Sequence, residues 1–191
     1  MTRRTPSPPA GYSLTELLVV ISIFMIVAGI TIPLAMTLTE QMRLNAAVRQ
    51  VERDIQTARL KAVQLNRPLR VRINCPVVGR YRTVEVMGND AVDNAGDRCD
   101  EARYPYPSPD DGDFTTPSAD GPVQYLADGT AFTAMDPLVL QFTPDGRTLQ
   151  VVGGTVQMIG PSGVDVGLVR GTSSTHSRTV NINGFGRITI R

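Results

Sequence analysis

The sequence contains few of the side chains that most enzymes and metal proteins use. It has no Trp, one His and two Cys among 191 residues. A zinc site needs about four nitrogen or sulfur ligands, and a Cys nucleophile needs a His partner. No Ser-His-Asp constellation or phosphate-binding glycine loop is found, and Asp110-Asp111-Gly112-Asp113 lacks the spacing and closing Glu of a calcium loop. We therefore expect no enzyme, no metal and no cofactor.

Charge is missing from one long stretch near the N-terminus. No charged residue occurs from Leu17 to Thr39, and the segment is apolar as far as Met36. This length is enough for a helix across a hydrocarbon core about 30 Å thick. Arg3 and Arg4 precede it and favour a cytoplasmic N-terminus, so the rest of the chain would lie outside. An ordinary secretory signal has a shorter apolar run that ends in a small-residue cut site. This run is too long and is followed by no such site in the right place, so it does not read as a secretory signal.

Glu16 is the one charge at the mouth of this apolar run. An ionised carboxylate there is costly and usually has a partner. Cleavage after Gly11 would create an α-amine at Tyr12, one helical turn before Glu16 and on the same face. In a packed filament Glu16 could then neutralise the amine of a neighbouring subunit. The alternative is a helix cap, with Ser13 as the N-cap and Glu16 three residues later.

The segment from Gly11 to Val20, GYSLTELLVV, resembles the processing site of type IV prepilins and type II secretion pseudopilins. The resemblance implies that a prepilin peptidase cuts between Gly11 and Tyr12 and then N-methylates Tyr12. It also implies that Glu16 supports subunit assembly and that Pro33 loosens the helix. Tyr12 stands where Phe is usual, but an aromatic residue is kept.

The same resemblance implies a location and a set of partners. The chain is expected to cross a bacterial inner membrane once, with its C-terminal head in the periplasm, and to enter a filament after assembly. The expected partners are other pilin or pseudopilin subunits, the prepilin peptidase and an inner-membrane assembly platform.

A helical pattern continues beyond the apolar run. Apolar residues recur at spacings of three and four and predict an amphipathic helix: Leu44, Val48, Val51, Ile55, Ala58, Ala62 and Leu65. Arg67-Pro68 should end it. The expected organisation is a leader at 1–11, a transmembrane and assembly helix at 12–36, an amphipathic helix at 37–67 and a β-rich head at 68–191.

After Pro68 the apolar period changes to two. Leu69, Val71 and Ile73 alternate with Arg70 and Arg72, which predicts a strand with one wet, basic face. Further strands are expected at 83–87, 138–142, 149–152, 155–159, 166–170, 179–183 and 187–190. The segment 88–122, rich in Asp, Pro and Gly, is expected to be a long loop. The prediction is an α+β, pilin-like fold in which the long N-terminal helix packs on a small antiparallel sheet of six to eight strands.

Charge distribution and cysteine content are two further features of the head. The segment from Gly88 to Asp120 contains nine acidic residues and two basic ones, and ten basic residues lie between Arg43 and Arg82. We interpret the basic region first as a solvated face. The alternative is a surface that meets phosphate, an acidic partner or lipid headgroups. In an exported domain two cysteines favour a disulfide, so a Cys75–Cys99 bridge is expected to pin the loop to the end of the first strand. Two free buried thiols are the alternative.

The head resembles the GspH/FimT group of the pilin superfamily. The resemblance rests on the basic helix ending at 66–68, on Phe142-Thr143-Pro144-Asp145-Gly146 and on the terminal hairpin at 180–190. A structural filament subunit is therefore the first hypothesis. A DNA-binding minor pilin that acts in natural transformation is the second, with basic residues near the C-terminus as candidates: Arg178, Arg187 and Arg191, joined by Arg170. An enzyme anchored by such a helix is the third hypothesis.

Overall fold

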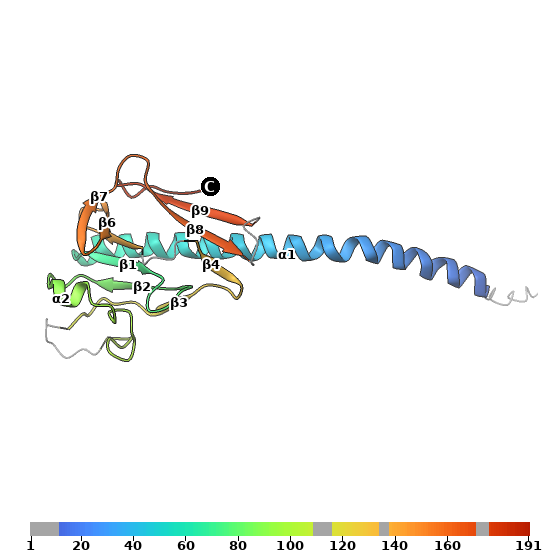
Figure 1. Ribbon diagram of the computed structural model, residues 1–191, viewed down its shortest axis with the longest axis horizontal. Coiled ribbons are helices and arrows are strands. Elements are labelled where there is room, and N and C mark those ends of the chain that lie inside the picture. The colour runs from blue at the N-terminus through green and yellow to red at the C-terminus, as the bar shows by residue number, and fades with distance from the viewer. Residues whose placement is uncertain (1–11, 109–115, 134–137, 171–175) are drawn as a thin grey trace, which may run out of the picture. The chain divides into compact units, whose positions relative to one another are not determined.

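A computed structural model describes residues 12–108, 116–133, 138–170 and 176–191. The helices are α1 (Leu14–Leu65) and α2 (Asp90–Asp93). The strands are β1 (Leu69–Ile73), β2 (Arg80–Glu85), β3 (Val123–Tyr125), β4 (Thr130–Phe132), β5 (Val139–Phe142), β6 (Thr148–Val152), β7 (Thr155–Met158), β8 (Val164–Arg170), β9 (Ser177–Ile182) and β10 (Ile188–Ile190). The expected α+β class is confirmed, with a long N-terminal helix followed by antiparallel strands (Figure 1).

The chain divides into two compact units, Met1–Glu40 and Gln41–Arg191. Helix α1 contributes its first part to one unit and its second part to the other. It ends where the sequence predicts, because Asn66 adopts a left-handed φ of 51°. The amides of Asn66 and Arg67 then bond back to the carbonyls of Val63 and Ala62 at 3.3 and 3.1 Å. These two bonds form a Schellman motif, in which Asn takes the place more often held by Gly.

The second unit contains two antiparallel sheets. One has six strands in the order β3-β2-β1-β5-β6-β7, and the other has four in the order β10-β9-β8-β4. Strands β1 and β2 pair with each other, as do β5 and β6. The pair β9–β10 forms the terminal hairpin that the sequence predicts. The sequence reasoning missed β3 and β4. Each has three residues, too few for an alternating pattern to be visible.

One core joins the second part of α1 to both sheets. The helix contributes Val48, Val51 and Ile55, which meet Leu140 of β5 and Leu168 of β8 in the same buried cluster. The predicted apolar stripe is confirmed as far as Ala62. Leu65 is instead 48% exposed, because the helix ends at this residue.

The expected wet face of β1 is wrong. All five residues of β1 are buried, including Arg70 at 4% exposure and Arg72 at 9%. Strand β1 lies inside the six-stranded sheet. The segment between β2 and β3, called here the covering segment, covers the basic face of β1 through contacts from Asp93, Asn94 and Ala95. This segment is irregular apart from α2 among its described residues, as the composition predicts.

Candidate functional site

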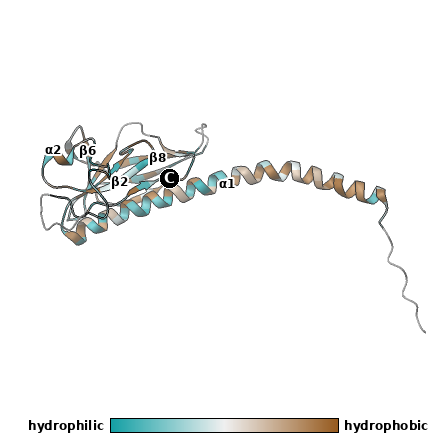
Figure 2. Cartoon of the chain, turned by 90° about the horizontal axis from the view of Figure 1, so that it is seen from below, coloured by the Kyte–Doolittle hydropathy of each residue, from teal (hydrophilic) through white to brown (hydrophobic). Residues whose placement is uncertain are grey.

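The apolar N-terminal part of α1 is the first candidate site. Every residue from Tyr12 to Thr39 is exposed within the chain, and α1 is long and apolar enough to cross a membrane. Figure 2 colours this part of the helix brown to near white beyond its first turn, whereas the part in the second unit carries much more teal. A helix that is apolar on all sides is stable only when lipid or other protein surrounds it.

Polar side chains within this segment hydrogen-bond to their own helix. The hydroxyls of Ser22, Thr31 and Thr39 donate to the carbonyls of Leu18, Val27 and Ala35, four residues earlier, at 2.8, 3.0 and 2.8 Å. Thr37 donates in the same way to the carbonyl of Leu34, three residues earlier, at 2.8 Å. Because these donors are satisfied locally, the hydroxyls cost little in an apolar environment. The segment can therefore enter lipid or a filament core despite its Ser and Thr content.

Glu16 lies in the first turn of α1. The hydroxyl of Ser13 is hydrogen-bonded to the hydroxyl of Thr15 at 2.9 Å, and the carbonyl of Ser13 accepts the amide of Leu17. Among the contacts of residues 12–17, none is the side-chain capping bond between Ser13 and Glu16 that the alternative interpretation requires. Gly11 and the leader lie outside the described residues, so the cleavage position stays a prediction.

Pro33 lies inside α1, which continues through it. Proline has no amide hydrogen, so the carbonyl of Gly29, one turn earlier, lacks its usual helical donor. Apart from its chain neighbours and the nearby helix backbone, no atom lies within 4 Å of the position that a Cβ would take at Gly29. The expected loosening of the helix at this point stays a prediction.

The basic residues near the C-terminus do not form one cluster. Arg178 turns toward α1, where its Nε donates to Asn45 Oδ1 at 3.4 Å. Arg191 continues β10 and exchanges backbone bonds of 2.8 and 3.0 Å with Thr179. Because side chains alternate along a strand, Arg178 lies on the opposite face from Arg191. Arg187 and Arg191 share a face, about 13 Å apart along the strand.

Arg170 was named as a further cation for DNA, and the structure contradicts that expectation. It is 7% exposed, and its Nη1 donates to the carbonyl of Asp128 at 2.6 Å and to Thr130 Oγ1 at 3.3 Å. It therefore holds the turn before β4 in place and offers little cation to solvent. The structure instead places Arg49 and Arg53 of α1 beside Ile190, along a surface groove that Glu52 also lines.

A second feature that the sequence reasoning missed is a layer of buried arginines, defined here as Arg70, Arg72, Arg82 and Arg98. Burial lowers the pKa of Arg70, Arg72 and Arg82 from its usual high value. Most of their partners are backbone carbonyls of the covering segment, at 2.7 to 3.1 Å: Asp93, Ala95, Tyr104 and Gly121. An irregular segment has no sheet partners for its carbonyls, and guanidinium forks supply the missing donors.

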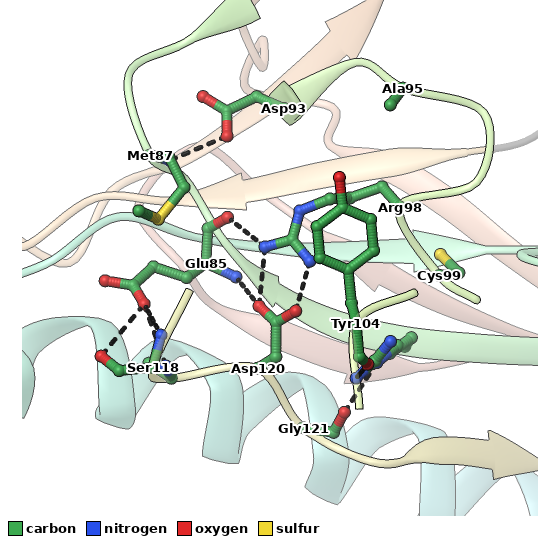
Figure 3. Close-up of polar contacts among 12 residues, drawn as sticks. Glu85, Met87, Asp93, Ala95, Arg98, Cys99, Tyr104, Ser118, Asp120 and Gly121 are labelled. Atoms are coloured by element: carbon green, nitrogen blue, oxygen red, sulfur yellow. Dashed lines mark hydrogen bonds and ion pairs between the residues drawn. The ribbon is translucent and has the colours of Figure 1, made fainter. Parts of the chain in front are cut away.

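Arg98 makes the strongest charge contact in this arginine layer. Figure 3 shows its guanidinium between Asp120, Tyr104 and the backbone of Glu85. It forms a two-bond ion pair with the Asp120 carboxylate, and both side chains are at most 1% exposed. Its Nη2 also donates to the carbonyl of Glu85 at 3.0 Å, and its Cζ lies 4.5 Å from the centre of the Tyr104 ring. A buried pair of this kind fixes the two parts of the chain that contribute to it.

Glu85 anchors the far end of the covering segment. Its carboxylate accepts the amides of Ser118 and Ala119 at 2.8 and 2.9 Å, and Arg67 Nη1 at 2.6 Å. Burial alone would raise the pKa of Glu85. The hydrogen bonds from Ala119, Arg67 and Ser118 outweigh burial and hold the pKa below its ordinary value of 4.5. Glu85 is therefore ionised at neutral pH and binds the chain at Ser118 and Ala119.

The predicted disulfide is confirmed. Cys75 follows β1, Cys99 follows Arg98, and the two Cα atoms are 5.7 Å apart. The bridge ties the covering segment to the strand that carries Arg70 and Arg72. Among the described residues, no group of three or more His, Cys, Asp or Glu side chains could hold a metal ion. Asp110, Asp111 and Asp113 lie outside those residues.

Comparison with known proteins finds two matching family models. The family of type II transport protein GspH matches residues 47–186, and the prokaryotic N-terminal methylation motif matches residues 8–32. No curated protein and no solved structure matches the chain. The methylation motif covers Glu16 and most of the apolar segment. The family match covers more than half of the chain, including every strand except β10. The chain therefore belongs to the GspH family, as a type IV pilin-like protein with an N-terminal methylation motif.

Proposed function

We propose that this chain is a minor pseudopilin, a structural subunit of a type II secretion pseudopilus or a type IV pilus rather than an enzyme. The observation that carries the proposal is the apolar part of α1, which is exposed along its length and has Glu16 as its one charged residue before Glu40. A filament core built from such helices would bury this surface. The proposed partners are other subunits of the same type and an inner-membrane assembly platform.

Processing would prepare the helix for assembly. Cleavage between Gly11 and Tyr12 by a prepilin peptidase, followed by N-methylation of Tyr12, removes the polar leader and leaves a cationic amine at the tip of the helix. Tyr12 is 87% exposed, which supports access at this position. Glu16 lies one helical turn further on.

Glu16 would select the docking position of a new subunit. A carboxylate within packed apolar helices is strongly disfavoured unless an opposite charge compensates it. The α-amine at Tyr12 of a neighbouring subunit supplies that charge, and it does so only when the two helices are correctly staggered. Pro33 would let the helix adjust locally during packing, because it removes one backbone bond.

The proposed orientation places the second unit in the periplasm. Arg3 and Arg4 favour a cytoplasmic leader. The Cys75–Cys99 disulfide supports the same orientation, because such bonds persist in oxidising compartments.

The assembly role is tested with Glu16→Ala and a matched control, Ser22→Ala, in the same apolar segment. We expect Glu16→Ala to be processed normally but to enter filaments at least about tenfold less often, because it loses a buried charge pair. The hydroxyl of Ser22 bonds only to its own helix among its described contacts, so its loss should leave incorporation unchanged. Sheared filaments are quantified by immunoblot. Normal incorporation of Glu16→Ala would remove the proposed pairing.

DNA binding is a second candidate function. The supporting observation is the groove in which Arg49 and Arg53 lie beside Ile190, the residue before Arg191. Side chains alternate along the strand, so Arg187 and Arg191 lie on the opposite face from Ile190 and would form a second phosphate contact separate from the groove. Binding at either place would weaken steeply with salt. Glu52 lines the same groove and reduces its positive charge.

The test is DNA binding by the full chain in detergent at low and moderate salt. Changing Arg187 and Arg191 together to Gln should abolish salt-sensitive binding if this function is real. Arg147→Gln is the control, because Arg147 is exposed and already paired with Asp145 at 2.9 Å. Absence of binding at low salt would leave the structural role alone.

A further inference from the structure

A small pocket opens between the outer face of β1 and the turn that joins β6 to β7. Its volume is about 120 Å³, and its walls include Arg70, Arg72, Asn94, Val151, Gly153 and Gly154. The turn is a two-residue hairpin in which both glycines have positive φ, 57° and 82°, as type I′ geometry requires. A Cβ at Gly154 would lie 3.2 Å from Asn94 Nδ2, so glycine leaves this wall open.

The two arginines that line this pocket retain unused donors within the described part of the chain. Arg72 is 9% exposed, and its Nε is buried without a hydrogen-bond partner. Within the described part of the chain, Arg72 bonds only through Nη1, to Ala95, and Arg70 only through Nε and Nη1. A buried guanidinium nitrogen without a partner carries a substantial desolvation cost. A ligand that accepts these hydrogen bonds would remove that cost.

Positive charge exceeds negative charge here. Asp93 also lines the pocket, but its carboxylate accepts the amides of Met87 and Gly88 at 2.8 and 2.9 Å. Burial lowers the pKa of the Arg72 guanidinium most, and the neighbouring charges of Arg70 and Arg98 lower it further. Asp97 raises the pKa of Arg72, and Asp93 and Asp90 raise the pKa of Arg70, but burial keeps both values lowered. The neighbouring cations still repel one another. A cation or a neutral ligand would leave that repulsion in place.

We propose that this pocket binds one compact oxyanion, held by the guanidinium groups of Arg70 and Arg72. Two planar forks that present several donors match the geometry of a carboxylate or a sulfate-like group. The oxyanion has two potential sources, an acidic side chain of a neighbouring protein subunit or a free inorganic anion. The site is separate from the filament-assembly helix, and the proposal does not depend on the proposed function.

The test observes the arginine side chains of the intact wild-type chain in detergent. Nε–Hε NMR signals are recorded while sulfate is added at constant ionic strength, and separately while a triglutamate peptide or a triglutamine control is added. We expect a saturable shift of the Arg72 Nε–Hε signal. The signal of exposed Arg147, which has its own Asp145 partner, should change only with ionic strength.

Variants then test the contribution of the Arg72 fork, with the Arg70 Nε–Hε signal as the measure of binding. Arg72→Gln should weaken binding at least roughly tenfold, because a charged hydrogen bond is lost, and Arg147→Gln should not. Arg72→Lys, which keeps the charge but loses the fork, should also weaken binding and guards against a Gln variant that does not fold.

The two probes separate the two sources. Saturation by triglutamate, with a weaker sulfate response, supports an acidic side chain from a partner, and saturation by sulfate alone supports a free anion. An Arg72 signal that follows Arg147 with both probes would overturn the proposal and leave a pocket filled only by water.

Discussion

The two faces of strand β1 are both buried but differ in chemistry. Leu69, Val71 and Ile73 point into the apolar core with α1, whereas Arg70 and Arg72 point into the arginine layer. The apolar face is stabilised by removing hydrocarbon from water, which depends on area and volume and is not directional. The arginine face is stable only where each donor meets an acceptor.

This difference teaches that burial alone does not tell how a site responds to substitution. On the apolar face, a small change of shape leaves most of the buried area in place. On the arginine face, a change of one atom can leave a charge unpaired inside the protein. The two faces should therefore respond very differently to changes of equal size.

The largest effect is expected for Asp120→Asn, which keeps the size of the side chain and removes its charge. Arg98 would then be a buried cation without its carboxylate, so the free energy of unfolding of the head should fall by about 4 kcal/mol. Urea unfolding of the chain in detergent, followed by circular dichroism, measures the change. A loss below about 1 kcal/mol would mean that the pair contributes as little as a surface pair.

Removal of the disulfide comes next. Changing Cys75 and Cys99 together to Ser frees a loop with a sequence separation of 24 residues. We expect the free energy of unfolding to fall by about 3 kcal/mol, because the unfolded chain gains entropy. Hydrogen exchange should show the largest loss of protection at residues 93–104, over the arginine layer. Equal loss across both sheets would instead indicate that the bridge supports the whole head.

A pH-dependent effect is expected for Glu85. Its pKa is lowered in the folded state, so its contribution to stability is fully present above its ordinary value of 4.5 and is lost as pH falls through the lower, folded value. Glu85→Gln should destabilise the head by about 2 kcal/mol at pH 7. Urea unfolding at a series of pH values should show the difference shrinking below about pH 4. A difference independent of pH would exclude an ionised Glu85 as the cause.

The smallest effect is expected on the apolar face of β1. Ile73→Val removes one methylene from a side chain that is 1% exposed, and should cost about 1 kcal/mol. The same urea titration measures it. A cost equal to that of Asp120→Asn would remove the proposed distinction between the two faces.

The sequence predicted those parts of the fold that depend on local patterns. The stripe from Leu44 to Ala62 and the stop at Arg67-Pro68 follow from helical periodicity and from proline geometry. Strand β1 follows from its alternation. The Cys75–Cys99 bridge was expected because an exported domain favours pairing of two cysteines.

The features that were missed depend on contacts between distant segments. Alternation in β1 does not tell whether Arg70 faces water or another layer, because that depends on where residues 88–122 pack. A signal was present in the opposite charges of the acidic segment and the arginine-rich strands, although backbone carbonyls, rather than carboxylates, supply most of the contacts. Arg170 was misjudged for the same reason, since its partners belong to a turn about 40 residues earlier.

The most direct test of the central claim, that this chain is a processed filament subunit, is the intact mass of the mature protein from bacterial membranes. The account predicts the mass of residues 12–191 with one added methyl group on Tyr12 and two fewer hydrogens than the reduced form, and Gly11→Leu should retain the leader. A wild-type mass that still includes residues 1–11, or an unchanged mature mass for Gly11→Leu, would contradict the account.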